Sequence, residues 1–327
     1  MKKKKDINAH ITEHNSIIKR MTDEIKKVII GQDAIIEKVL IGLFSKGHII
    51  IEGMPGLAKT LLLKTLSQII HTSFNRIQFT PDLLPADLIG TRIYDRRTGK
   101  FYTRKGPIFA NLILADEINR APAKVQSALL EAMEEKQVTI GDETFKLDEP
   151  FMVMATQNPI ESEGTYRLPE AQVDRFMLKI KIGYPSFDDE HEIINRMTTG
   201  RGIKVKTITT PDEILRIREI VDNIYVDELI KKYILNIVFA TRKMGSNGVG
   251  IEEHIEYGAS PRASIYLTTT AKAHAFINSR SHVMPEDVAA TAFEVLRHRI
   301  ILTYEAEAGG VSTDELIKRL FEKVEVP

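Results

Sequence analysis

Apolar residues recur at helical spacing in the first segment of the chain. Between Ala9 and Val28 they are interleaved with charged residues, at Ile11, Ile17, Ile18, Met21 and Ile25. This spacing brings the apolar side chains onto one face of a helix and leaves charged side chains on the other. The pattern therefore predicts an amphipathic helix, which we assign to an N-terminal segment of residues 1–26.

The pattern then changes, because short apolar runs alternate with helical stretches as far as about Pro185. Continuous apolar runs of this length are typical of strands buried on both faces, and helices between them favour parallel pairing. We therefore expect an α/β core with a parallel sheet over residues 27–200. The expected strands are His48–Glu52, Arg76–Phe79, Leu112–Ala115, Phe151–Ala155 and Met177–Ile182.

Two segments interrupt the alternation of strands and helices. Thr91–Thr103 contains a Thr98-Gly99 turn between apolar and aromatic residues, and Gln137–Leu147 contains Gly141-Asp142 in the same position. Turn residues of this kind between alternating strands indicate β-hairpins. Both hairpins are expected as insertions into the α/β core.

Helix start signals dominate after Pro185. Thr210, Ser260 and Met284 are each followed by proline, a residue favoured in the first turn of a helix. Acidic residues follow the first and third of these prolines, as expected near a helix N-terminus. The sequence thus predicts a helical second domain, an all-α lid, over residues 201–327.

Composition narrows the possible functions. The chain has 327 residues, 45 Lys+Arg, 45 Asp+Glu and no Cys, a length that suggests about two domains. The lack of Cys excludes disulfides and Cys-ligated metals, and the balanced charge does not favour nucleic acid as a partner. Apolar runs fall short of the roughly 20 residues of a membrane span. We expect a soluble, cytoplasmic protein.

The strongest chemical signal is a glycine-bearing loop between an apolar strand and an apolar helix. Such loops cradle phosphate groups with backbone amides, while the lysine contacts the β- and γ-phosphates and the following hydroxyl binds Mg²⁺. Ala58 replaces the second fixed glycine of the P-loop pattern, and the loop is retained if Ala58 has a negative φ. The candidate nucleotide-binding residues are Gly53, Met54, Pro55, Gly56, Leu57, Ala58, Lys59, Thr60 and Leu61, with Thr60 also a metal ligand.

Acidic and amide side chains follow two later strands. Asp116 and Glu117 end the run Leu112–Ala115, and Asn158 follows Phe151–Ala155. The carboxyl ends of parallel strands share one edge of the sheet, so Asp116 is a candidate Mg²⁺ ligand and Glu117 a candidate base for an attacking water. Asn158 is suited to holding that water or the γ-phosphate. Taken alone, the two acids also fit an ordinary charged strand end.

Two arginines complete the candidate catalytic set. Arg175 lies in Asp-Arg-Phe and Arg262 in Ser-Pro-Arg. Guanidinium groups neutralise the charge that develops in phosphoryl transfer, in cis or in trans. An isolated arginine is more often part of a surface ion pair, so these two depend on the motifs before them.

In this order, Gly53–Thr60, Asp116-Glu117, Asn158, Arg175 and Arg262 resemble the Walker A, Walker B, sensor 1, arginine finger and sensor 2 motifs of AAA+ ATPases. Three longer stretches resemble the MoxR branch of that family: Gln78–Gly90, Leu114–Pro122 and Ala155–Gln172. The resemblance covers about residues 25–307 and implies a P-loop NTPase core with a helical lid. It implies that Ile30, Gly31 and Gln32 line the adenine pocket and that the hairpins are family inserts. Arg167 departs from the family's usual proline.

The resemblance also implies a function. ATP and Mg²⁺ would be the ligands, and copies of the chain would form a ring of six in which Arg175 reaches a neighbour's nucleotide. The ring would act as a chaperone-like remodeller in the maturation or assembly of client proteins, with partners that carry a von Willebrand factor A domain.

Two alternatives remain open. Related AAA+ proteins include nucleic-acid motors, and the hairpin of residues 92–105 contains a cluster of basic residues that could contact phosphates. A magnesium-chelatase-like subunit is the other alternative. His298, between Arg297 and Arg299, has no role that its chemistry predicts.

Overall fold

The computed structural model describes residues 2–158, 166, 168–198, 203–242 and 251–327. The chain divides into two compact units. The N-terminal unit comprises Lys19–Arg175 and Ile180–Leu215, and the C-terminal unit comprises Met1–Ile18, Phe176–Lys179 and Arg216–Pro327.

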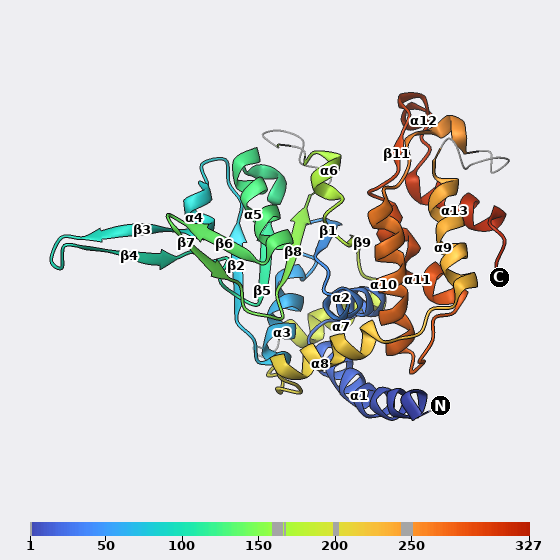
Figure 1. The fold of residues 1–327 in the computed structure, drawn as a ribbon, viewed down its shortest axis with the longest axis horizontal. Helices are drawn as coiled ribbons and strands as arrows, with labels where there is room; N and C mark the ends of the chain where they lie inside the picture. Colours follow the sequence, from blue (N-terminus) through green and yellow to red (C-terminus); the bar gives the residue numbers. More distant parts are fainter. Residues whose placement is uncertain (1, 159–165, 167, 199–202, 243–250) are drawn as a thin grey trace. The chain divides into compact units, whose positions relative to one another are not determined.

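A five-stranded sheet with the order β2-β5-β8-β1-β9 forms the centre of the N-terminal unit (Figure 1). Its neighbouring pairs β2–β5, β5–β8 and β8–β1 are parallel. The apolar runs are buried as expected, and Ile49, Ile50 and Ile51 are fully inaccessible. The strands are β1 (Ile49–Gly53), β2 (Phe74–Gln78), β5 (Leu112–Asp116), β8 (Met152–Gln157) and β9 (Leu178–Ile182).

Helices connect and cover these strands. The N-terminal helix is longer than its apolar pattern suggests, and it buries Ile18, Met21 and Ile25. Helix α3 begins at Lys59 and packs against β2 and β5. The elements are α1 (Lys2–Lys26), α2 (Asp33–Phe44), α3 (Lys59–Ile70), α4 (Pro85–Ile89), η1 (Ile118–Arg120), α5 (Ala123–Glu135), α6 (Glu170–Val173), α7 (Phe187–Met197) and α8 (Pro211–Asp222).

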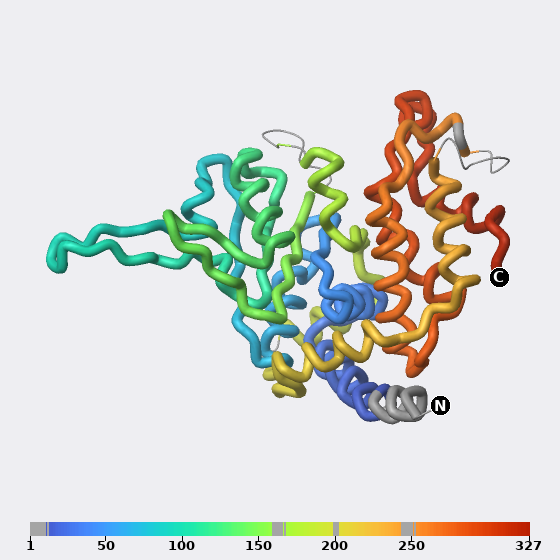
Figure 2. Tube along the Cα trace, viewed as in Figure 1, coloured from blue at the N-terminus to red at the C-terminus, as the bar shows by residue number. Residues whose placement is uncertain are grey.

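Both predicted hairpins are present. Strands β3 (Gly90–Asp95) and β4 (Lys100–Lys105) pair antiparallel, as do β6 (Gln137–Ile140) and β7 (Glu143–Lys146). Both turns use a glycine with positive φ, 68° at Gly99 and 64° at Gly141. The β3–β4 hairpin projects away from the sheet (Figure 2). Arg92, near the base of this hairpin, contacts Asp142 in the turn of the β6–β7 hairpin, with Nη1 2.9 Å from Oδ2.

The C-terminal unit is mostly helical. The predicted N-caps are present, since the hydroxyls of Thr210 and Ser260 accept backbone N–H groups of α8 and α10. One short antiparallel ladder, β10–β11, is an addition that the sequence pattern does not indicate. The elements are α9 (Glu228–Ala240), η2 (Glu252–His254), β10 (Ile255–Tyr257), α10 (Pro261–Ile277), α11 (Pro285–Leu296), β11 (Ile301–Leu302), α12 (Tyr304–Ala308) and α13 (Thr313–Lys323).

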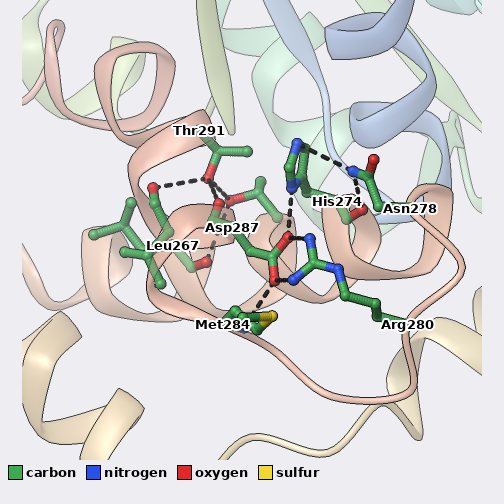
Figure 3. A network of polar contacts seen from close by, with 9 residues as sticks. Leu267, His274, Asn278, Arg280, Met284, Asp287 and Thr291 are labelled. Atoms are coloured by element: carbon green, nitrogen blue, oxygen red, sulfur yellow. Dashed lines mark hydrogen bonds and ion pairs between the residues drawn. The ribbon is translucent and has the colours of Figure 1, made fainter. Parts of the chain in front are cut away.

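A buried carboxylate joins α10 to α11 (Figure 3). Asp287 is fully inaccessible and accepts two hydrogen bonds from the Arg280 guanidinium, at 2.8 and 2.5 Å. His274 Nδ1 lies 2.6 Å from Asp287 Oδ1, and the Met284 amide donates to Oδ2 at 2.8 Å. A buried charge is tolerated when it is paired and hydrogen-bonded in this way. The network fixes the packing of the two helices.

Candidate functional site

The phosphate-binding loop lies between β1 and α3 in the N-terminal unit. It turns through two residues with positive φ, Gly56 at 88° and Ala58 at 55°. Positive φ is easily adopted by glycine because no Cβ meets the backbone. Gly56 therefore lets the loop turn where a residue with a Cβ would be strained.

The expectation for Ala58 was wrong. Its backbone is left-handed, with φ 55° and ψ 18°, and it is the N-cap residue of α3. The consensus glycine is favoured here because the chain reverses its local handedness just before the helix begins. Alanine adopts the same conformation at a cost of about 1–2 kcal/mol. The loop therefore keeps its shape with a strained residue, not through an ordinary helical conformation.

Lys59 begins α3 and points back along the loop. Its Nζ donates a hydrogen bond to the Gly53 carbonyl at 2.6 Å. Partial burial lowers the pKa of Lys59, and the negative charges of Asp116 and Glu117 partly oppose this effect. An anionic ligand in the loop would favour the charged ammonium in the same way as these two carboxylates.

Asp116 is held at the carboxyl end of β5 by two neighbouring strands. The Thr156 hydroxyl on β8 donates to Oδ1 at 2.6 Å, and the Arg76 guanidinium on β2 donates to Oδ2 at 3.0 and 2.6 Å. These contacts fix the direction of the carboxylate. Only 17% of the Asp116 side chain is exposed.

Glu117 follows directly and has a left-handed backbone, with φ 56°. Its amide donates to the Thr156 hydroxyl at 2.9 Å, so one hydroxyl orders both acids. Its Oε2 accepts a hydrogen bond from Gln78 Nε2 at 2.7 Å and lies 3.2 Å from Arg120 Nε. A strained backbone at a polar site is a common feature of functional residues.

These side chains surround one pocket of about 370 Å³, a volume within the usual range for small-molecule sites. Eleven of the residues proposed from the sequence are among those that line it. Arg76 and Thr156 are lining residues that the sequence reasoning did not assign. The lining residues are Gly53, Pro55, Gly56, Leu57, Ala58, Lys59, Thr60, Leu61, Arg76, Asp116, Glu117, Thr156 and Asn158.

The segment proposed to line the adenine pocket, residues 30–32, contacts the phosphate-binding loop through Gln32. Gln32 Nε2 lies 3.5 Å from the Leu57 carbonyl oxygen. Gly31 has φ 70°, and a Cβ there would overlap the Asp189 carboxylate. Ile30, Gly31, Gln32 and Met54 are not among the residues that line the 370 Å³ pocket. Their part in binding a base stays a prediction.

Arg175 lies at a different place in the N-terminal unit. Its Nη2 is 3.1 Å from Glu134 Oε2 on α5, and it borders a second pocket of about 330 Å³. That pocket is also lined by Ser127, Leu130, Glu131, Glu134, Glu135 and Gln172. Arg175 is thus not among the residues that line the P-loop pocket of its own chain. A contribution to the site of a neighbouring chain requires such a separation.

Arg262 belongs to the C-terminal unit and lies in the first turn of α10. Its amide donates to the Ser260 hydroxyl at 3.2 Å. A role of its guanidinium toward the γ-phosphate stays a prediction. Arg167 lies outside the described residues.

The donor set suits Mg²⁺. Thr60 and Asp116 line the same pocket and offer a hydroxyl and a carboxylate oxygen, the hard ligands that Mg²⁺ takes together with phosphate oxygens and water. Asp116 Oδ2 is already paired with Arg76. A bound cation would therefore compete with the guanidinium for this oxygen.

Within the described residues, no helix combines the length and apolar character that a membrane span requires.

Comparison with known families matches both parts of the chain. The model for the ATPase family associated with various cellular activities (AAA) matches residues 48–178, and the model for the AAA lid domain matches residues 250–320. The first match contains the whole P-loop pocket, and the second contains Arg262.

Relatives match over nearly the full length. The chain is 49% identical to the chaperone MoxR1 of Mycobacterium tuberculosis, over 95% of this chain and 82% of that protein. It is 28% identical to the protein MoxR of Methylorubrum extorquens, over 98% of both chains. A crystal structure from Cytophaga hutchinsonii superposes with a TM-score of 0.92 at 50% identity, covering 100% of this chain and 98% of that one. The chain belongs to the MoxR branch of the AAA ATPase family.

Proposed function

We propose that the protein hydrolyses ATP with the help of Mg²⁺ at the pocket between β1, β5 and β8. The observation that carries this proposal is the convergence of Lys59, Thr60, Asp116, Glu117 and Asn158 on one 370 Å³ pocket. These residues come from the start of α3 and from the ends of β5 and β8, yet together they offer a cation, metal ligands and a base.

Different residues of the chain would bind the phosphates and the Mg²⁺ ion. The loop amides around Gly56 and the N-terminus of α3 face the phosphates, where aligned N–H groups favour negative charge. Lys59 exchanges its hydrogen bond with the Gly53 carbonyl for one to a phosphate oxygen. Thr60 and Asp116 would hold Mg²⁺, which would supply charge neutralisation on the phosphate oxygens.

Glu117 is the proposed general base. It would accept the proton of the attacking water, and Asn158 would orient that water or the γ-phosphate. The contacts from Gln78 and Arg120 hold the Glu117 carboxylate at the pocket wall.

The position of Arg175, outside the P-loop pocket, supports completion of the site by a second copy. We propose that it contacts the nucleotide of a neighbouring chain, and that Arg262 contacts the γ-phosphate in its own chain. An arginine supplied in trans makes hydrolysis depend on assembly. The contact is heterologous, so its repetition closes a ring, for which we propose six subunits.

The biological role is proposed from the relatives. One of them is named a chaperone, which supports a chaperone-like role in maturing or assembling other proteins. Partners with a von Willebrand factor A domain and a cytoplasmic location are part of the same proposal.

A second candidate function rests on the β3–β4 hairpin. Tyr94, Phe101 and Tyr102 are 52%, 60% and 52% exposed, among the basic residues Arg92, Arg96, Arg97, Lys100, Arg104 and Lys105. Aromatic and basic side chains together are typical of surfaces that bind single-stranded nucleic acid. Stimulation of ATP hydrolysis by DNA that falls steeply with added salt would favour this candidate.

The proposed function is tested by phosphate release in the presence of Mg²⁺. Wild-type protein should turn over ATP, and Glu117→Gln should lose that turnover while still binding ATP. Glu219→Gln changes an exposed glutamate on α8 and is the matched control, with turnover expected at the wild-type level. Turnover of Glu117→Gln at the wild-type rate would contradict the assignment of the base.

A further inference from the structure

Three consecutive residues directly after α11 donate hydrogen bonds to one short backbone segment. Arg297 Nη1 donates to the Lys179 carbonyl at 3.0 Å, and His298 Nε2 lies 3.0 Å from the Phe176 carbonyl oxygen. Arg299 donates to the carbonyls of Phe176 and Met177, at 2.6 and 3.3 Å. The Phe176–Lys179 segment and residues 297–299 belong to the same compact unit.

The two arginines are buried where they make these contacts. The Arg297 side chain is 8% exposed and also pairs with Asp314 at 3.0 Å. Arg299 is 5% exposed, and its guanidinium stacks 4.8 Å from the centre of the Tyr266 ring. A buried guanidinium is stable only when its donors find acceptors. Here the backbone carbonyls of Phe176–Lys179 supply them.

His298 completes the set as a neutral donor. A carbonyl oxygen only accepts hydrogen bonds, so the proton is on Nε2. Nδ1 is buried and has no hydrogen-bond partner within the described part of the chain. Burial, with help from the Arg299 charge, holds the pKa of His298 well below its ordinary value.

The held segment begins directly after Arg175. Arg175 is the last residue of its stretch of the N-terminal unit, and Phe176 is the first of the short stretch assigned to the C-terminal unit. Consecutive Cα atoms are about 3.8 Å apart. The backbone at Arg175 is therefore tied, one residue away, to a carbonyl that both His298 and Arg299 bind.

Sheet topology gives these contacts a second consequence. Strand β9 begins at Leu178 and is the edge strand of the sheet. Arg297 donates to the carbonyl of Lys179, the second residue of β9, while His298 and Arg299 bind carbonyls directly before this strand.

We propose that Arg297 and His298 are positioning residues for Arg175. By binding the backbone directly after Arg175, these two residues hold the point of the chain from which Arg175 enters the neighbouring site. This inference rests on the proposed function, in which Arg175 acts in trans. Hydrolysis in one site then depends on the C-terminal unit of the chain that donates the arginine, as well as on the chain that holds ATP.

The experiment compares His298→Leu with His298→Gln. Leucine removes the donor to Phe176 and leaves the Arg299 contact to the same carbonyl, whereas the glutamine amide restores a donor. We expect His298→Leu to bind a fluorescent ATP analogue as wild type does. Its turnover should fall by about tenfold to a hundredfold, the effect of a small misplacement of a catalytic group. His298→Gln should recover most of the loss.

Mixing the His298→Leu and Glu117→Gln proteins distinguishes a loss of Arg175 positioning from a general structural defect in the His298→Leu chain. His298→Leu chains have a sound P-loop pocket and can use Arg175 of a Glu117→Gln neighbour. An equal mixture should reach about a quarter of wild-type turnover, because random assembly gives this pairing at about one interface in four. Arg297→Met is the second variant and should behave in the same way. Asp314→Asn is its control, since it removes the ion pair of Arg297 but not the bond to Lys179.

Three results would overturn the inference: wild-type turnover of His298→Leu, equal loss in His298→Gln, or no recovery on mixing with Glu117→Gln. Arg175→Ala is measured in the same assay, because it distinguishes failure of the proposed role of Arg175 from failure of the positioning role. If Arg175→Ala hydrolyses ATP as wild type does, the proposed role of Arg175 itself fails. If Arg175→Ala is inactive and His298→Leu is not rescued, only the positioning role fails.

Discussion

Replacing Ala58 by glycine should stabilise the protein. Ala58 has φ 55° and ψ 18°, and an alanine in this left-handed region costs about 1–2 kcal/mol relative to its preferred conformations. Glycine removes that cost but adds about 0.4–1 kcal/mol of conformational entropy to the unfolded chain. The expected net gain in the free energy of unfolding is about 0.5–1 kcal/mol.

The assay is thermal or guanidinium unfolding of the nucleotide-free protein. For a domain of this size, the gain corresponds to a rise in Tm of about 1–4 °C. Ala128→Gly is the matched control because Ala128 lies inside helix α5. The same substitution there should destabilise by about 1 kcal/mol, since glycine is a poor helix former.

The two substitutions should therefore act in opposite directions. A loss of stability in Ala58→Gly similar to that in Ala128→Gly would show that Ala58 has a negative φ in solution. The reasoning about strain in the loop would then be wrong, and the loop would keep its shape by the ordinary helical conformation of alanine.

Three further predictions concern charged groups. Arg76→Met removes the cation that competes for Asp116 Oδ2, so the Mg²⁺ concentration for half-maximal turnover should fall about fivefold, equivalent to about 1 kcal/mol; an unchanged Mg²⁺ requirement would contradict this. Burial lowers the pKa of Lys59, and bound phosphates should raise it again. The affinity for ATP should therefore be highest at pH values below the pKa that Lys59 has in the nucleotide-free protein. It should fall as the pH rises through that pKa. Lys59→Arg should flatten that profile, and an equally steep one would refute the explanation. Asp287→Asn removes the fully buried carboxylate charge that pairs with Arg280, whose side chain is 25% exposed, and should cost about 3 kcal/mol in guanidinium unfolding. A loss below about 1 kcal/mol would mean that the network in Figure 3 contributes little.

Much of the fold could be predicted because its signals are local. Each apolar run that was assigned as a strand contributes to the five-stranded sheet, since strands buried on both faces need continuous apolar residues. Asp116 and Asn158 could be placed near the P-loop because the carboxyl ends of parallel strands meet at one edge. Glycine positions in the two hairpin turns were equally readable.

The features that could not be predicted from the sequence depend on contacts between residues far apart in the chain or on unusual backbone conformations. Arg76 contacts Asp116 because β2 lies beside β5, although β2 follows β1 in the chain; sequence order alone does not give this neighbour. The ladder of β10 and β11 consists of strands too short to show a periodicity. The left-handed backbone of Ala58 could not be inferred either, because alanine itself favours negative φ.

The contacts of His298 could not be predicted from the sequence either. Its partner, the Phe176 carbonyl, is 122 residues away in the chain, and a backbone acceptor leaves no residue type to recognise. The pattern Arg-His-Arg indicates only that polar groups are present.

Mixing Glu117→Gln with Arg175→Ala tests most directly the central claim that each ATP site is completed by a neighbouring chain. Each variant alone should release phosphate far more slowly than wild type, because one lacks its base and the other its arginine. In an equal mixture, sites with Glu117 from one variant and Arg175 from the other should restore about a quarter of wild-type turnover. A mixture no more active than its two components would contradict the account.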